Sequence, residues 1–143
     1  MNTERLRKQL KRDEGVRESA YQDSEGYWTI GVGHLIDPAK GGKLSRGEIE
    51  YILSNDIDRA VYRLDHEYDW YSDLNDVRQE VVVNMVFNLG IKGFGRFVNT
   101  IDAIVRGDWL DASREMLDSK WASQVGERAI RLAHAMRTGQ WGV

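Results

Sequence analysis

Hydrophobic residues first recur at helical spacing in residues 3–14. Leu6 and Leu10 stand four positions apart and therefore share one face of a helix. Thr3 can cap the N-terminus, and Gly15 can supply the left-handed residue that ends the helix. The pattern predicts a helix over residues 3–14 with one apolar face.

Between Ala20 and His34 the hydrophobic period changes to two. Turn residues occupy positions 23–26, and aromatic and β-branched residues alternate after them. Trp28, Ile30 and Val32 fall on one side of such a strand, and Tyr27 and Thr29 fall on the other. This segment is predicted to form a hairpin or a small sheet.

A long amphipathic helix is predicted over residues 45–64. Ser45 and Glu48 have the spacing of a capping box. Apolar residues then keep helical spacing for about five turns, at Ile49, Ile52, Leu53, Ile57, Ala60, Val61 and Leu64. Asp56 lies within or beside this apolar stripe, and a carboxylate in that position needs a partner.

The second half of the chain is patterned as further helices. Residues 76–89 are apolar almost all round, which predicts a helix buried on most sides. Glycines at positions 90, 93 and 95 break it. Shorter helices are predicted over residues 97–105, 108–117 and 125–136, with Asp108 as the cap of the middle one.

Together these elements predict an α+β fold in a single domain, residues 1–143. A chain of 143 residues has the usual size of one domain. A small β-containing lobe, residues 15–44, is followed by the connecting helix 45–64 and by an all-helical lobe, residues 65–143. Helix 3–14 is expected to fold back onto the helical lobe.

Composition excludes several kinds of site. Because the chain has 0 cysteines, it has no disulfide, thiolate metal centre or cysteine nucleophile. The histidines at 34, 66 and 134 lack metal-ligand spacing, so no metal or cofactor is predicted. The longest apolar run, residues 81–83, is far shorter than the roughly 18 residues of a membrane span. The basic N-terminus lacks the apolar stretch of a secretory signal.

Charge gives little support for a nucleic-acid ligand. The net charge is −3, and the five tryptophans lack interleaved basic residues, so core packing is predicted for them instead of base stacking. Segment 120–137 carries four basic residues against the single acid Glu127. That excess permits an anionic ligand there without requiring one.

The most specific chemistry lies between Glu14 and His34. Glu14 falls at a helix end, where the negative end of the dipole disfavours ionisation, and Asp23 falls in a wetter turn. Two carboxyl groups in unlike environments suit general acid and base hydrolysis of a glycosidic bond. By spacing alone this signal is weak, and a surface glutamate at a helix end with an aspartate in a turn explains the pair better.

The whole string is more informative than the pair. It reads E-G-x5-Y-x-D-x2-G-x2-T-I-G-x-G-H from Glu14 to His34, and it resembles the signature of the phage-type lysozymes, endolysins of the T-even phage kind (glycoside hydrolase family twenty-four). The resemblance continues through residues 84–88, 97–100 and 137–141, so it covers essentially the whole chain. It implies a small sheet lobe, a long helix and a helical lobe with a cleft between the lobes.

The resemblance implies roles for three residues. Glu14 corresponds to the catalytic acid, Asp23 to the carboxylate that activates water or steadies the cation, and Thr29 to the hydroxyl that positions this water. The reaction implied is inverting hydrolysis of the β-1,4 bond between N-acetylmuramic acid and N-acetylglucosamine in peptidoglycan, without metal or cofactor.

Supporting residues are implied in the same way. Arg128 corresponds to an arginine that pairs with the acid, although a solvated arginine on a helix face is the alternative. His34 and Asp56 correspond to a structural salt bridge. Substrate contacts are implied for Leu35, Phe87, Asn88 and Thr100, with core packing as the alternative for Phe87. Glu115 stands where the family has an asparagine contact, which leaves that contact open.

Two rival functions are a lytic transglycosylase, which uses one acid and no water, and a wall-binding relative without activity. Asp23 and Thr29 would have no task in the first, and retention of all three site residues argues against the second. The family setting implies host cell lysis by a phage enzyme. Such an enzyme would be a monomer that accumulates in the host cytoplasm, makes no stable membrane insertion and reaches the wall through a holin lesion.

Overall fold

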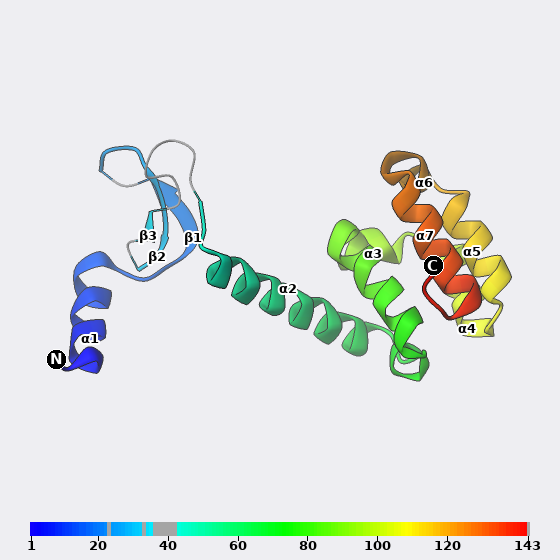
Figure 1. Ribbon diagram of the computed structural model, residues 1–143, viewed down its shortest axis with the longest axis horizontal. Coiled ribbons are helices and arrows are strands. Elements are labelled where there is room, and N and C mark those ends of the chain that lie inside the picture. Colours follow the sequence, from blue (N-terminus) through cyan, green and yellow to red (C-terminus); the bar gives the residue numbers. More distant parts are fainter. Residues whose placement is uncertain (23, 33, 36–42, 143) are drawn as a thin grey trace. The chain divides into compact units, whose positions relative to one another are not determined.

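The computed structural model describes residues 1–22, 24–32, 34–35 and 43–142 (Figure 1). The chain divides into two compact units, Met1–Tyr51 and Ile52–Val143. Helices and a small sheet are both present, so the predicted α+β class is confirmed. The single domain with three lobes, and the folding back of the N-terminal helix, concern the two units together and stay predictions.

The first unit opens with helix α1, Thr3–Glu14. Its bounds match the prediction, but the cap does not. The side chain of Asn2 accepts a hydrogen bond of 2.9 Å from the backbone N–H of Arg5, so Thr3 is the first helical residue and its predicted capping role is wrong. At the other end, Gly15 has a φ of 78° and donates its N–H to Lys11.

A three-stranded antiparallel sheet follows in the order β1-β2-β3. The strands are β1 (Arg17–Gln22), β2 (Trp28–Gly31) and β3 (His34–Leu35). Tyr21 pairs with Thr29, and Ile30 pairs with His34. The predicted hairpin is therefore confirmed, although its first strand begins at Arg17 instead of Ala20.

Helix α2, Arg46–Glu67, begins with the predicted capping box. The backbone N–H of Ser45 donates to Glu48 Oε1 at 2.8 Å, and the backbone N–H of Glu48 donates to Ser45 Oγ at 3.2 Å. The helix continues three residues beyond the predicted end at residue 64.

The second unit is helical. After the short 3-10 helix η1 (Tyr71–Asp73) come α3 (Asp76–Gly95), α4 (Val98–Arg106), α5 (Trp109–Leu117), α6 (Lys120–Val125) and α7 (Glu127–Thr138). Gly90 has a φ of 75° and kinks α3, as the predicted break requires. The cap at Asp108 is confirmed by a 3.0 Å hydrogen bond from the N–H of Asp111.

One α-helix of this unit was not predicted. Residues 120–125 form α6, capped by Ser119, and Gly126, with a φ of 59°, separates it from α7. The helix predicted over 125–136 therefore begins two residues later. The signal was present in the sequence, because Ser119 is a favoured N-cap residue and accepts a hydrogen bond from Ala122.

The core of the second unit is built around α3, as its all-round apolar pattern predicts. The largest fully buried side chains are Phe94, Leu64, Met85, Met116, Met136, Val81, Val82 and Thr100. In Figure 1, α7 (orange to red) runs beside α5 (yellow). Trp121 is buried, whereas Trp141 is 44% exposed, so the predicted core packing is wrong for Trp141.

The N-terminus of α3 is joined to the C-terminus of α7 by two side chains. Asn75 Nδ2 donates to the carbonyl of Gly139 at 3.1 Å. Arg78 donates to the carbonyls of Met136 and Arg137, and its guanidinium lies 4.0 Å from the ring centre of Trp109. A cation at the carbonyl end of a helix is favourable, so this contact stabilises α7.

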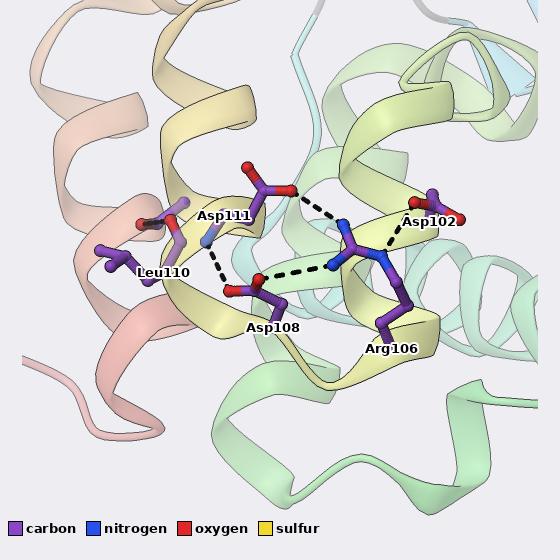
Figure 2. Close-up of polar contacts among 6 residues, drawn as sticks. Asp102, Arg106, Asp108, Leu110 and Asp111 are labelled. Carbon is purple, nitrogen blue, oxygen red and sulfur yellow. Dashed lines mark hydrogen bonds and ion pairs between the residues drawn. The ribbon is translucent and has the colours of Figure 1, made fainter.

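A charged cluster fixes the corner between α4 and α5 (Figure 2). Arg106 donates through Nε to Asp102 at 3.0 Å, through Nη1 to Asp108 at 3.4 Å and through Nη2 to Asp111 at 2.9 Å. The hydrogen bonds that Arg106 donates to Asp102 and Asp111 raise its pKa, and the bond to Asp102 contributes most. One arginine thus connects α4 to the cap and the first turn of α5.

Replacing this arginine tests the role of the cluster. We expect Arg106→Ala to lower the Tm by about 1–3 °C in low salt, because exposed ion pairs contribute little individually. The loss should shrink in about 1 M NaCl, where exposed charges are screened. Arg114→Ala, an exposed arginine on α5, is the matched control. Equal losses for both variants would contradict a specific role for the cluster.

Among the described residues, no single helix has both the length and the hydropathy needed to cross a bilayer. Only α3 and α4 taken together reach that threshold, and they are bent by 101° at their junction.

Candidate active site

The predicted site residues are distributed over both units of the chain. Glu14, Thr29 and His34 belong to the first unit, together with the backbone of Leu35 in β3. Asp56, Phe87, Asn88, Thr100 and Arg128 belong to the second unit. Asp23 lies outside the described residues.

Glu14 is the last residue of α1 and is exposed. The helix stops there because Gly15 adopts a positive φ and its N–H bonds to the carbonyl of Lys11 at 3.0 Å. The carboxyl group therefore stands at the negative end of the helix dipole, as the sequence predicts.

Thr29 lies in the middle strand of the sheet and is only 2% exposed. Its hydroxyl Oγ1 donates to the carbonyl of Tyr27 at 3.1 Å. A hydroxyl has one proton and two lone pairs, so Oγ1 can still accept a hydrogen bond. The bond to Tyr27 fixes the hydroxyl of Thr29, so its oxygen is positioned to accept a hydrogen bond from a second group.

His34 and Asp56 each have a partner within their own unit. His34 Nε2 lies 3.5 Å from Glu48 Oε2, and Asp56 Oδ1 lies 3.5 Å from Arg59 Nη2 on the next turn of α2. The partner that Asp56 needs is thus supplied locally. The implied His34–Asp56 salt bridge joins residues of different units and stays a prediction.

Glu48 was missed as a partner of His34, although the capping box points to it. Its hydrogen bonds with the backbone and then the side chain of Ser45 lower its pKa from the ordinary value of 4.5. Burial opposes this shift, and the charge of His34 adds to it. Because the capping box turns the carboxylate back towards Ser45, one oxygen caps the helix and the other faces His34.

The capping box should make stability depend on pH. A carboxylate whose pKa is lowered by folding stabilises the protein above its unfolded-state pKa, and that contribution is lost as the pH falls through the lowered value. We expect Glu48→Gln to lower the Tm at pH 7 and the difference from the parent protein to vanish as the pH falls well below 4.5. Thermal unfolding followed by circular dichroism measures this. Glu50→Gln, exposed on the same helix, is the control and should show no such dependence.

In the second unit, a hollow of about 500 Å³ lies beside α2 and α3. Its walls are mostly apolar and include Ile57, Val83 and Phe87, with Asn84 and Arg128 among the polar lining residues. Phe87 is 47% exposed within this unit, so the core alternative for this residue is wrong. An exposed aromatic ring on a hollow is the kind of apolar surface that a sugar-binding site uses.

Arg128 is held by a neighbouring helix and is not a freely solvated helix-face residue. Its Nε donates to Asn84 Oδ1 at 3.0 Å, and its Nη2 donates to the backbone carbonyl of Asn84 at 3.4 Å. The same two residues also line a second hollow of about 1000 Å³ along α7. Asn84 is a residue of this site that the sequence pattern did not indicate.

A third hollow, of about 370 Å³, contains two of the implied contact positions. Thr100 and Glu115 both line it, and Thr100 is itself only 1% exposed. Nearby, Asn88 Oδ1 accepts a 2.8 Å hydrogen bond from Trp121 Nε1, and Trp121 lines the hollow. Asn88 thus fixes the indole in the wall of this hollow.

Within the described ranges of the chain, no three histidine, aspartate or glutamate side chains gather into a set that could hold a metal ion.

Known proteins resemble this chain along nearly its full length. The family profile described as Phage lysozyme matches residues 11–136. Probable T4-type lysozyme 1 of Dictyostelium discoideum is 28% identical over 160 aligned positions, which cover 94% of each chain. The Endolysin of Acyrthosiphon pisum secondary endosymbiont phage 1 is 29% identical over 123 positions, covering 83% of this chain and 80% of that one.

A part of a larger protein is similar too. The pre-baseplate central spike protein Gp5 of Enterobacteria phage T4 is 31% identical over 158 positions, which cover 91% of this chain and 27% of that protein. The resemblance in the sequence is thus confirmed by the family profile, which matches residues 11–136. The chain belongs to the phage lysozyme family of peptidoglycan-lytic enzymes.

Proposed function

We propose that this protein is a muramidase that hydrolyses the β-1,4 bond between N-acetylmuramic acid and N-acetylglucosamine with inversion at the anomeric carbon. The observation that carries the proposal is the complete string from Glu14 to His34, which lies inside the family match over residues 11–136. The lysozyme and endolysin names of its relatives support the same substrate.

In this proposal Glu14 is the general acid. Its proton passes to the glycosidic oxygen as the bond from that oxygen to the anomeric carbon breaks, so the leaving sugar departs as a neutral alcohol. Glu14 suits this task by position, because α1 ends at this residue and its side chain is exposed.

Asp23 and Thr29 act on the attacking water. Asp23 takes one proton from the water as its oxygen bonds to the anomeric carbon on the opposite face of the sugar ring. The hydroxyl of Thr29 already donates a hydrogen bond to the carbonyl of Tyr27. Its Oγ1 therefore accepts a hydrogen bond from the second O–H group of the water. An inverting reaction of this kind needs the two carboxyl groups roughly 6.5–9.5 Å apart to admit the water.

The remaining implied residues hold the substrate or support the acid. Phe87 and Leu35 supply apolar contacts to sugar rings, and Asn88 and Thr100 supply polar groups. Arg128 pairs with the carboxylate that Glu14 becomes when it has given up its proton, and His34 with Asp56 has a structural role.

The biological setting that we propose is lysis of a bacterial host by a phage. The enzyme works there as a monomer without a metal or cofactor, and a holin lesion admits it from the host cytoplasm to the wall. Two relatives that carry the name endolysin come from phages, which supports this setting.

Analysis of the products tests the reaction. Purified peptidoglycan is incubated with the protein, and new reducing ends are converted with borohydride and identified by mass spectrometry. A muramidase yields muramitol ends. Glucosaminitol ends would overturn the choice of bond, anhydromuramic ends would identify a lytic transglycosylase, and binding without cleavage would identify a wall-binding protein.

A further inference from the structure

Asn84 on α3 and Arg128 on α7 are 44 positions apart in the sequence and are joined by a hydrogen bond. We infer that Asn84 is a positioning residue, which sets the orientation of the Arg128 guanidinium towards an anionic group of the active site. The inference rests on the proposed function and assigns Asn84 a task in it. Asn84 itself is not placed in contact with the reacting atoms.

The geometry of the contact fixes the guanidinium. Nε and Nη2 form one edge of that planar group, and both are directed at Asn84, at 3.0 Å to Oδ1 and at 3.4 Å to the backbone carbonyl. Two bonded points on one edge of a rigid plane determine where its other donors point. Nη1 takes part in neither bond and is directed away from Asn84.

The charge of Arg128 is placed where it does not stabilise the fold. It is the second residue of α7, at the positive end of the helix dipole, where a cation is disfavoured. Among the described residues of the second unit, no carboxylate lies within 4 Å of its nitrogens in an ion pair. By contrast, Arg78 binds the carbonyl end of the same helix, where a cation is favoured.

A neutral amide therefore holds this cation. Asp76 and Glu80 line the hollow of about 500 Å³ with it, and Glu80 Oε2 accepts a hydrogen bond from Trp141 Nε1 at 2.5 Å. Arg131 and His134 line the hollow of about 1000 Å³ on the other side. Because Asn84 is uncharged, its contact with Arg128 does not neutralise the guanidinium.

The guanidinium is also accessible. Asn84 and Arg128 line both hollows, so a carboxylate can approach the outer edge of the guanidinium without displacing Asn84. A stabilising contact between two helices could be made by any hydrogen-bonded pair, whereas an arginine held along one edge and open along the other is suited to binding an anion.

A double-mutant cycle tests whether Asn84 acts through Arg128. We expect Asn84→Ala to lower kcat/KM by about tenfold and Arg128→Ala to lower it further. The double variant should match Arg128→Ala alone, because the task of Asn84 is lost once the guanidinium is absent. Fully additive losses would overturn the inference, and so would unchanged activity of Asn84→Ala.

Asn84→Asp distinguishes positioning from a purely structural contact. This variant keeps the shape and the acceptor atom, so it should fold at least as stably, but its new charge neutralises the guanidinium. We expect it to lose activity as Asn84→Ala does. Full activity of Asn84→Asp would show that the contact only holds α3 and α7 together.

A second readout does not depend on activity. The Nε–H proton of Arg128 is expected to exchange slowly with water in the parent protein, as observed by ¹⁵N NMR, and about tenfold faster in Asn84→Ala. Asn75→Ala is the matched control. Asn75 also links the two helices, but it does so at Gly139, beyond the other end of α7 from Arg128. It should lower stability and leave this proton unchanged. An unchanged exchange rate of the Nε–H proton in Asn84→Ala would overturn the inference, even if the parent protein cleaves peptidoglycan. A parent protein that does not cleave peptidoglycan would refute only the proposed function.

Discussion

Glu14→Gln is expected to lower the rate of peptidoglycan cleavage by about 10²–10⁴-fold, the usual contribution of a general acid. The amide has the shape of the protonated carboxyl group but cannot deliver a proton to the leaving oxygen. Glutamine also has a helix propensity close to that of glutamate, and the helix stop depends on the backbone of Gly15, so α1 should form as before. The loss should therefore appear in kcat without a change in Tm.

The control for this variant is Glu18→Gln. Glu18 is an exposed carboxylate on β1 in the same unit, and its removal changes the net charge equally. Its activity should stay within about twofold of the parent value. Comparable losses in both variants would mean that charge on this unit, and not acid catalysis by Glu14, controls cleavage.

Asp23→Ala is expected to cause a loss of similar size, about 10²–10⁴-fold, because the attacking water would then have no base. Azide needs no deprotonation and is small enough to take the place of the water and the missing carboxylate. Added azide should therefore restore part of the turnover of Asp23→Ala and yield a glycosyl azide, while it leaves Glu14→Gln inactive.

Glu25→Gln is the matched control, since it removes a carboxylate two positions further along the chain. Its cleavage rate should equal that of the parent protein. If Asp23→Ala kept full activity, the general-base role would be wrong, and a mechanism with a single acid would explain the reaction better.

Features set by local sequence could be predicted well. The capping box at Ser45 and Glu48, the cap at Asp108 and the break at Gly90 each depend on residues within four positions of one another, and all three are confirmed. The α+β class followed from the change of hydrophobic period near residue 20, which the sheet confirms.

The sequence-based prediction failed in two places, for two different reasons. Asn2 and Thr3 are both good caps, and the structure uses Asn2, which the sequence pattern alone could not decide. The second failure was at residues 120–125, where a helix of six residues is too short to show a periodic apolar stripe. Its cap at Ser119 was the only local signal.

Contacts between residues far apart in the sequence could not be predicted from the spacing of residue types. Asn84 and Arg128 are held together by the packing of α3 against α7, and nothing in the local pattern around either residue indicates the other. The same holds for Asn88 and Trp121, which are 33 positions apart. The catalytic assignments came from the family signature, because a glutamate and an aspartate nine positions apart have no unique chemistry.

The most direct test of the account is cleavage of peptidoglycan in H₂¹⁸O with the parent protein and Glu14→Gln, followed by mass spectrometry and rapid NMR of the new ends. Attack of water with inversion predicts one ¹⁸O atom at the anomeric carbon of each new muramic acid end, initially in the α configuration, with almost no product from Glu14→Gln. Unlabelled anhydro ends, or labelled ends that form first in the β configuration, would contradict it.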